Sequence, residues 1–268
     1  MSNKALVVDN DFFFVEFLSE LLEDRGYEVD KARDGKEAIS KLEAGSFDLV
    51  FVDLIMPKID GRQFIEFARK RYPDATFPII AMSATFVEQP DDIKGIGADY
   101  YLAKGPMETM AEYVNNLMDK LEKEPLPDHG EEPLIEPSQI YPRLVTDELM
   151  ESVKFHKAVL EGIGVGVMII DKDARIIVSN SLALEITNRS LDEVLNQPVT
   201  SVFPPRERER LVKTLKDIIR NRALRKLAFE AVINAQVIRV IVSVLRVNEE
   251  IAGWIMAMEE SERWAGQV

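Results

Sequence analysis

Hydrophobic residues in the first half of the chain follow two alternating patterns. Short apolar runs, typical of buried strands, occur at residues 5–8, 48–52, 78–82 and 99–102, with a shorter one near 28–30. Between them, apolar residues recur at helical spacing: Phe13, Phe17, Leu18, Leu21 and Leu22; Ala38, Ile39 and Leu42; Phe64, Ile65, Phe67 and Ala68; Val114, Leu117, Met118 and Leu121. Five strands alternating with five helices predict a parallel sheet with right-handed crossovers and helices on both faces.

The second half has a different pattern. Residues 123–145 are dense in proline and acidic side chains and are predicted to form an extended, mobile linker. A helix is expected to follow, with Thr146 as its N-cap. Further strands are predicted at 165–171, 175–179, 228–235, 237–247 and 251–258, and helices at 180–187, 192–195 and 205–222. These patterns predict an α/β domain over 1–122, the linker, an α+β domain over 146–260 with helices on one face of a five-stranded antiparallel sheet, and a tail over 261–268.

Composition narrows the possible functions. Hydrophobic residues make up 46% of the chain, which supports globular folding. No apolar run approaches the roughly 18 residues of a membrane-spanning helix, so we expect no membrane insertion, and we see no secretory signal pattern. The chain has no cysteine, which excludes thiolate metal sites and fits a cytoplasmic protein. Its net charge of −14 opposes non-specific binding of nucleic acid.

Four candidate reactive residues stand at the ends of the predicted strands. Asp9 follows the first strand and Asp53 the third, while Ser83 and Lys104 follow the fourth and fifth. Because the carboxyl ends of parallel strands meet at one edge of a sheet, we expect these side chains to lie close together. Aspartate can accept a phosphoryl group, carboxylates bind Mg²⁺, and lysine supplies a compact positive charge. Alone, such an acid or serine is more often a turn or cap residue and such a lysine a solvated charge, but the four together predict a cation and phosphoryl site.

Residues 4–122 resemble a response regulator receiver domain through the motifs Leu6-Val7-Val8-Asp9, Asp53-Leu54-Ile55-Met56-Pro57 with Asp60-Gly61, Met82-Ser83-Ala84 and Tyr101-Leu102-Ala103-Lys104. The resemblance implies a flavodoxin-like, doubly wound sheet with strand order 2-1-3-4-5. It implies that Asp53 accepts a phosphoryl group from a histidine kinase or phosphotransfer protein, and that Lys104 and Ser83 contact the phosphate. Tyr101 would be an aromatic switch that turns inward when Ser83 moves. The implied Mg²⁺ ligands are Asp9, Asn10, the Asp53 carboxylate and the Ile55 backbone carbonyl.

Two positions depart from the receiver pattern. Asn10 stands where the family usually has a second acid, so we expect weaker metal binding unless Asp11 turns towards the site. Gly105 separates Lys104 from Pro106, where the family usually has Lys-Pro directly, which puts the loop geometry in question. Ile55 is apolar and cannot orient a water molecule, so the receiver is expected to catalyse its own phosphorylation but only a slow dephosphorylation. No separate catalytic domain is visible.

Residues 148–260 resemble a PAS domain through the segments 163–171, 176–180 and 195–198. Such domains enclose a cofactor or mediate dimerisation, and we expect a homodimer. Neither His129 nor His156 lies in the middle helices, so haem ligation is disfavoured, and the absence of cysteine excludes a flavin–thiol adduct. The ligand stays unassigned: Asn180 and Arg239 could be its polar anchors, but a capping or surface role is favoured for each. Four large side chains are interpreted as core rather than as a cofactor pocket: Met168, Phe203, Phe229 and Trp254.

The sequence as a whole predicts a two-component response regulator in which phosphorylation of Asp53 changes the partner or dimer contacts of both domains. The basic residues between 206 and 226 alternate with acids and are interpreted as a solvent-exposed helix face, so no direct nucleic-acid binding is expected. His156 lacks the neighbours of a phosphoryl-donating histidine and is interpreted as an ordinary helix residue. Two alternatives remain: the N-terminal regulatory part of a hybrid sensor histidine kinase, and a scaffold that works without phosphorylation.

Overall fold

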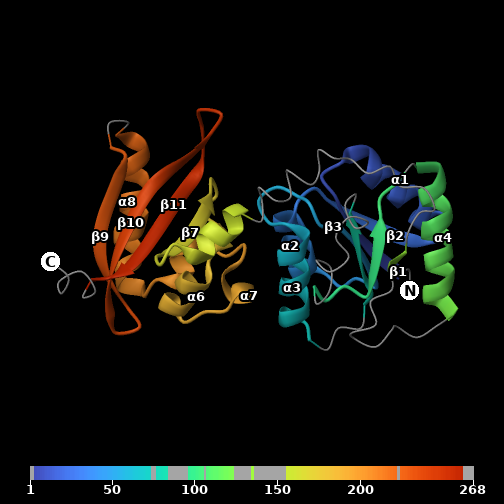
Figure 1. Cartoon of the computed structure of the whole chain (residues 1–268), viewed down its shortest axis with the longest axis horizontal. Coiled ribbons are helices and arrows are strands. Elements are labelled where there is room, and N and C mark those ends of the chain that lie inside the picture. Colours follow the sequence, from blue (N-terminus) through green and yellow to red (C-terminus); the bar gives the residue numbers. More distant parts are fainter. Residues whose placement is uncertain are drawn as a thin grey trace. The chain divides into compact units, whose positions relative to one another are not determined.

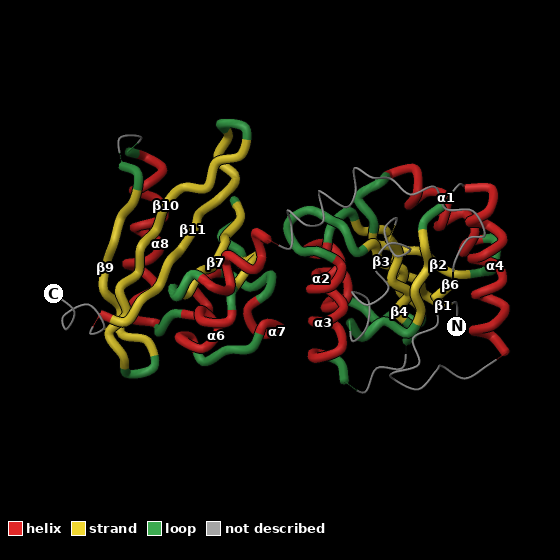
Figure 2. Tube along the Cα trace, in the orientation of Figure 1, coloured by secondary structure: helices red, strands yellow, loops and turns green. Residues whose placement is uncertain are grey.

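A computed structural model describes residues 3–73, 77–83, 96–105, 107–123, 134–135, 155–221 and 224–261. The chain divides into two compact units, Met1–Glu151 and Ser152–Val268 (Figures 1 and 2). The predictions for Thr146, for His129, for most of the linker and for the helix expected between the fourth and fifth strands lie outside the described residues.

The first unit is built on a parallel sheet. Its strands are β1 (Asn3–Val8), β2 (Tyr27–Ala32), β3 (Leu49–Asp53), β4 (Ile79–Ser83), β5 (Tyr100–Ala103) and β6 (Leu134–Ile135), in the order β2-β1-β3-β4-β5-β6. The predicted order 2-1-3-4-5 is confirmed. The sixth strand was not predicted: it lies in the segment interpreted as a free linker and pairs with Tyr101 and Leu102. A two-residue strand carries no periodicity that sequence reasoning could detect.

Helices cover both faces of this sheet. Figure 1 shows α1 (Phe12–Glu23) and α4 (Met107–Lys123) on one side and α2 (Gly35–Ala44) and α3 (Gly61–Arg71) on the other. Every residue of β3, β4 and β5 is buried, as expected for strands covered on both faces. Each large apolar side chain buried in this way stabilises the fold by about 1.5–3 kcal/mol.

The predicted apolar stripe of α1 is wrong at one position. Phe13 is 73% exposed, whereas Phe14, Val15, Leu18 and Leu22 are buried. Three consecutive phenylalanines, at 12–14, suit more than one helix phase, so the pattern alone could not choose. The phase agrees with an N-cap at Asp11, whose carboxylate accepts hydrogen bonds from the backbone N–H groups of Phe13 and Phe14.

The second unit is an antiparallel sheet with helices packed on it. Its elements are β7 (Gly166–Asp171), β8 (Ile176–Ser179), α6 (Ser181–Thr187), α7 (Leu191–Val194), the 3₁₀ turn η2 (Val199–Val202), α8 (Pro205–Arg220), β9 (Lys226–Ile233), β10 (Gln236–Val247) and β11 (Glu250–Glu260). The strand order is β8-β7-β11-β10-β9, which confirms the predicted five-stranded sheet. Residues 155–162 form a further helical segment. The core between helices and sheet includes all four side chains interpreted as core: Met168, Phe203, Phe229 and Trp254.

Two polar residues of this unit have structural roles. The buried Asn180 side chain caps α6 by accepting from the N–H of Ala183, and it also binds Val167, Val165 and Leu160. Arg239 forms a 3.3 Å ion pair with Glu259 across β10 and β11. The capping and surface interpretations of Asn180 and Arg239 are therefore confirmed. None of the helices in the described ranges is sufficiently long and apolar to cross a bilayer.

Candidate functional site

Three charged side chains meet at the carboxyl edge of the parallel sheet. The Lys104 ammonium nitrogen lies 2.6 Å from Asp9 Oδ2 and 3.2 Å from Asp53 Oδ2. Asp9 is fully buried and Asp53 is 5% exposed, so both carboxylates are largely removed from water. A single cation shared by two buried acids leaves the group with excess negative charge, which favours binding of a further cation.

Backbone hydrogen bonds hold this edge in place. The Asp9 N–H donates to the Ala32 carbonyl, and the Lys104 N–H donates to the Ser83 carbonyl at 2.8 Å. These contacts continue the strand ladders past β1 and β5, so the two residues are fixed as firmly as the sheet. Gly61 is also required here: a Cβ atom at this residue would lie 2.1 Å from the Asp53 carbonyl oxygen.

The environment of Asp53 opposes its ionisation. Burial raises the pKa of the Asp53 carboxyl to about 6, against the opposing effect of the Lys104 ammonium, and the nearby Asp9 raises it further. A hydrogen bond from the Ile55 backbone N–H lowers the pKa in part. Above this pKa, Asp53 is a poorly solvated carboxylate, which is the state needed in a nucleophile.

The residues present fit Mg²⁺. Asp9 Oδ2 is buried and its close polar contact in the described residues is the Lys104 ammonium, which the Asp53 carboxylate also faces, so two hard oxygen donors converge. Asp11 does not add a third carboxylate, because its side chain caps α1. Asn10 is exposed beside them. In the described part of the chain no cluster of three or more acidic, histidine or cysteine side chains could hold a metal, so any cation here depends on neutral oxygens as well.

Comparison with known families agrees with this geometry. Residues 5–115 match the family model of the response regulator receiver domain, and residues 154–258 match that of the PAS fold. The chain carries a response regulator receiver domain followed by a PAS domain. Receiver domains use Mg²⁺ in phosphorylation, which matches the oxygen donors at Asp9 and Asp53.

Two curated regulatory proteins and one solved response regulator structure are each similar to part of this chain. The chain is 38% identical over 106 residues to the alkaline phosphatase synthesis transcriptional regulatory protein PhoP of Bacillus subtilis, covering 39% of this chain and 43% of that protein. It is 34% identical over 115 residues to the regulatory protein VanRc of Enterococcus gallinarum, covering 41% and 48%. The crystal structure of response regulator protein TrrA from Thermotoga maritima, in complex with Mg(2+)-BeF, is 34% identical, with a TM-score of 0.39, and the match covers 45% of this chain and 97% of that one. The chain thus spans less than half the length of the two curated relatives.

Two further predicted site residues of the receiver domain are buried. Ser83 ends β4 and is 1% exposed, and Tyr101 on β5 is completely buried. The side chain expected to act as an aromatic switch is therefore inward in this structure. Ile55 follows Asp53 in the loop after β3, and its side chain is 44% exposed.

One contact of the receiver site was missed by sequence reasoning. The Lys104 ammonium lies over the ring of Phe14, 4.8 Å from its centroid. The available signal was the run of three phenylalanines directly after the acidic loop, but the mistaken helix phase pointed to Phe13 instead. A contact between α1 and the end of β5 depends on how the two elements pack.

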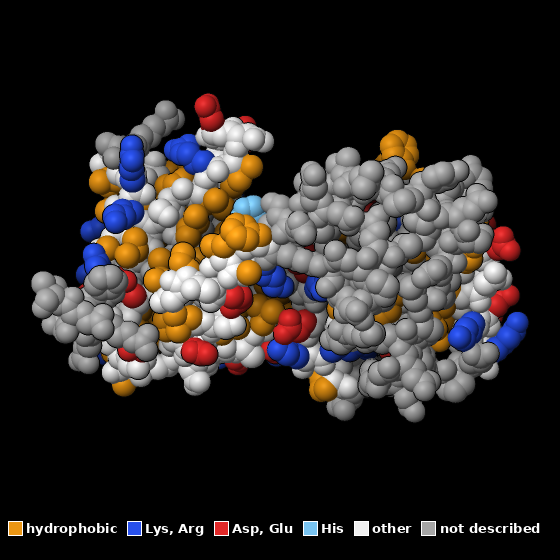
Figure 3. Space-filling view, viewed as in Figure 1, with side chains coloured by type: hydrophobic (Ala, Val, Ile, Leu, Met, Phe, Trp, Pro, Cys, Tyr) orange, Lys and Arg blue, Asp and Glu red, His pale blue; other side chains and the backbone are white. Residues whose placement is uncertain are grey.

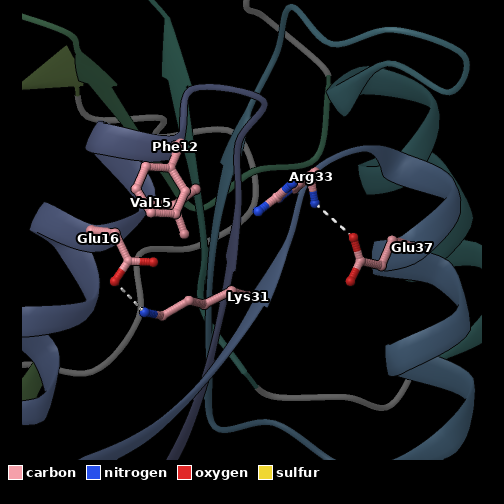
Figure 4. A pocket seen from close by; sticks show the side chains of 6 residues that line it. All are labelled: Phe12, Val15, Glu16, Lys31, Arg33 and Glu37. Atoms are coloured by element: carbon pink, nitrogen blue, oxygen red, sulfur yellow. Dashed lines mark hydrogen bonds and ion pairs between the residues drawn. The ribbon is translucent and has the colours of Figure 1, made fainter.

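A hollow on the receiver domain has a lining that does not include these acids. Figure 4 shows it lined by Phe12, Val15, Glu16, Lys31, Arg33 and Glu37. Lys31 pairs with Glu16 at 2.7 Å, and the Arg33 backbone N–H donates to Glu37. Two acidic and two basic side chains line the hollow, so its net charge is close to zero, although Arg33 contacts Glu37 only through its backbone.

Proposed function

We propose that this protein is a two-component response regulator whose Asp53 receives a phosphoryl group from a histidine kinase or a phosphotransfer protein. The observation that carries the proposal is the convergence of Asp9, Asp53 and Lys104, with one ammonium nitrogen 2.6 Å and 3.2 Å from the two carboxylates. An acid nucleophile, oxygen donors for a cation and a compact positive charge are the parts that phosphoryl transfer requires.

The chemistry assigns one role to each residue. An Asp53 carboxylate oxygen attacks phosphorus, an O–P bond forms, and the P–N bond to the donor histidine breaks as its imidazole leaves. Lys104 and the Ser83 hydroxyl then contact the new phosphate oxygens. Asp9, Asn10, the Asp53 carboxylate and the Ile55 carbonyl would hold Mg²⁺, which supplies positive charge to the transferring oxygens. Slow dephosphorylation follows from the apolar Ile55 beside the acceptor.

An apolar rim supports a protein as the phosphoryl donor. The large hydrophobic side chains exposed in the described part of the receiver domain all follow strand ends at this edge: Phe12 at 52%, Phe13 at 73%, Ile55 at 44% and Met107 at 42%. Exposed apolar groups around a reactive carboxylate favour docking of a complementary protein surface over a small, polar donor.

The PAS domain is proposed to form a homodimer. Phe155 and Val159 are 65% and 46% exposed, and their spacing of four places them on one side of the helical segment 155–162; Ile163, directly after the segment, is 52% exposed. Figure 3 shows further hydrophobic side chains gathered over β10 and β11 on the visible face. An exposed apolar stripe of this kind is stabilised by pairing with a second copy. Phosphorylation would change this pairing or the partners of the receiver. We propose a cytoplasmic protein with domains over 1–122 and 146–260, in which the connecting segment 123–145 includes β6, paired with β5.

The decisive experiment is phosphorylation of the full chain. With acetyl phosphate and Mg²⁺, intact mass spectrometry is expected to show one added phosphoryl group, and Asp53→Asn is expected to show none. A chain that stays unmodified with acetyl phosphate and with histidine-phosphorylated donors would overturn the proposal. Light scattering of a Phe155→Glu, Val159→Glu variant tests the dimer, which should dissociate while phosphorylation continues.

A further inference from the structure

The ammonium group of Lys104 has three close neighbours. Two are the carboxylates of Asp9 and Asp53, and the third is the aromatic face of Phe14, 4.8 Å from the nitrogen. The Lys104 side chain is only 17% exposed. A cation within about 6 Å of a ring centroid is attracted by the negative face of the ring, and the attraction grows as water is excluded.

We propose that Phe14 is a positioning residue for Lys104, and that the face of its ring holds the ammonium group beside Asp53 for phosphoryl transfer. The inference rests on the proposed function of Asp53 for its consequence. The contact itself is a property of the folded receiver domain and is measurable without any phosphoryl group.

The ring is itself held firmly, as a positioning group must be. Phe14 is 6% exposed and belongs to the core between α1, α4 and the sheet. Its backbone N–H donates to the capping carboxylate of Asp11, and its ring lies 6.0 Å from that of Phe17. Since the first turn of α1 is capped and its inward face is packed, the ring has little freedom to move away from Lys104.

The contact matters because the Lys104 backbone is held by Ser83, whereas the other groups that hold its ammonium are shared with the metal site. Gly105 follows Lys104 directly, and glycine leaves the backbone after the lysine with the greatest conformational freedom. The carboxylates of Asp9 and Asp53 are also the proposed ligands of Mg²⁺, so the metal competes with the Lys104 ammonium for their oxygens. An aromatic face binds no divalent cation in competition, and it therefore keeps the ammonium near Asp53 in each state of the site.

The test changes the charge distribution of the ring while nearly preserving its shape. Phe14 is replaced in the full chain by monofluoro-, difluoro- and trifluorophenylalanine, because each fluorine withdraws negative charge from the ring face. With each added fluorine, the rate of phosphorylation by acetyl phosphate with Mg²⁺ is expected to fall. The concentration of beryllofluoride that saturates the receiver is expected to rise. Between phenylalanine and trifluorophenylalanine, the phosphorylation rate should fall about fivefold. Phe67→Leu is the matched control, since it removes a buried aromatic ring from α3, on the opposite face of the sheet from Phe14 (Figure 1).

A second readout needs neither metal nor phosphate. Protons above an aromatic ring are shifted upfield in NMR spectra, so the ε-methylene protons of Lys104 should be shifted upfield in the metal-free chain. Phe14→Leu should remove this shift, and Phe67→Leu should keep it.

The outcomes separate the possible explanations. A rate that is insensitive to fluorination, together with a loss in Phe14→Leu, would show that Phe14 only fills space and would overturn the proposal. An unshifted Lys104 signal in the folded wild-type chain would also overturn it. If the wild-type chain accepts no phosphoryl group, the function proposed for Asp53 fails, and the Lys104 shift alone then decides whether the ring positions the ammonium.

Discussion

Replacing Asp53 by asparagine is expected to stabilise the metal-free receiver domain at neutral pH. The substitution keeps the size of the side chain and removes its charge. Lys104 keeps a partner, because Asp9 Oδ2 lies 2.6 Å from its ammonium nitrogen. The variant therefore loses the cost of a buried ionised carboxylate without leaving the lysine unpaired.

The pKa of Asp53 gives the size and the sign of the effect. Burial raises this pKa from 3.8 to about 6 in the folded chain. The native state thus binds more protons than the unfolded chain between about pH 4 and 6, and its stability falls as the pH rises through this window. At 1.36 kcal/mol for each pKa unit, the ionised carboxylate costs about 3 kcal/mol above pH 6. The free energy of unfolding of Asp53→Asn should exceed that of the wild type by this amount at pH 7.5 and by very little at pH 4.

The assay must follow the receiver separately from the PAS domain. Both tryptophans, Trp254 and Trp264, belong to the second unit, so tryptophan fluorescence reports on the PAS domain and serves as an internal control. Hydrogen exchange of β1 and β3 peptides in a urea series with EDTA gives the stability of the receiver. Added Mg²⁺ should stabilise the wild type more than the variant and narrow the difference, because the ion neutralises the carboxylate.

One exposed acid of the receiver supplies the comparison. Asp24→Asn replaces an exposed side chain at the end of α1 and should change stability by less than about 0.5 kcal/mol at any pH. The reasoning fails if Asp53→Asn is no more stable than wild type at pH 7.5 in EDTA. It also fails if the difference between the two proteins does not shrink as the pH is lowered to 4.

Three further substitutions test other parts of the structure. Lys104→Ala leaves the fully buried Asp9 without its cation and should destabilise the metal-free receiver by about 3 kcal/mol in the urea series; an unchanged midpoint would contradict this. Gly61→Ala places a Cβ atom 2.1 Å from a carbonyl oxygen and should cost more than about 2 kcal/mol in thermal unfolding, whereas Gly45→Ala, whose nearest neighbouring atom is 3.9 Å away, should be close to neutral. Equal effects at the two glycines would refute the steric argument. Asn180→Ala removes a buried side chain that makes four hydrogen bonds and should lower PAS stability, read by tryptophan fluorescence, by about 3 kcal/mol without slowing phosphorylation.

Most of the architecture was determined by local pattern. Apolar runs located the strands β1, β3, β4 and β5, and their alternation with helical stripes required a parallel sheet. Because parallel strands end at one edge, the positions of Asp9, Asp53 and Lys104 in sequence were sufficient to predict that they meet. The structure brings these three together, with Ser83 at the end of the strand between them.

Tertiary packing decided what the pattern left open. Periodicity could not choose between Phe13 and Phe14, and the capped start and packed face of α1 put Phe14 over Lys104. The spacing of the acids did not show that Asp11 caps a helix instead of turning to the metal site. The pattern of apolar residues did not show that Leu134 pairs with Tyr101. Each of these outcomes depends on a competition between groups that are distant in sequence or equal in composition. Local propensity does not distinguish such groups, and only their mutual packing gives one arrangement the lower free energy.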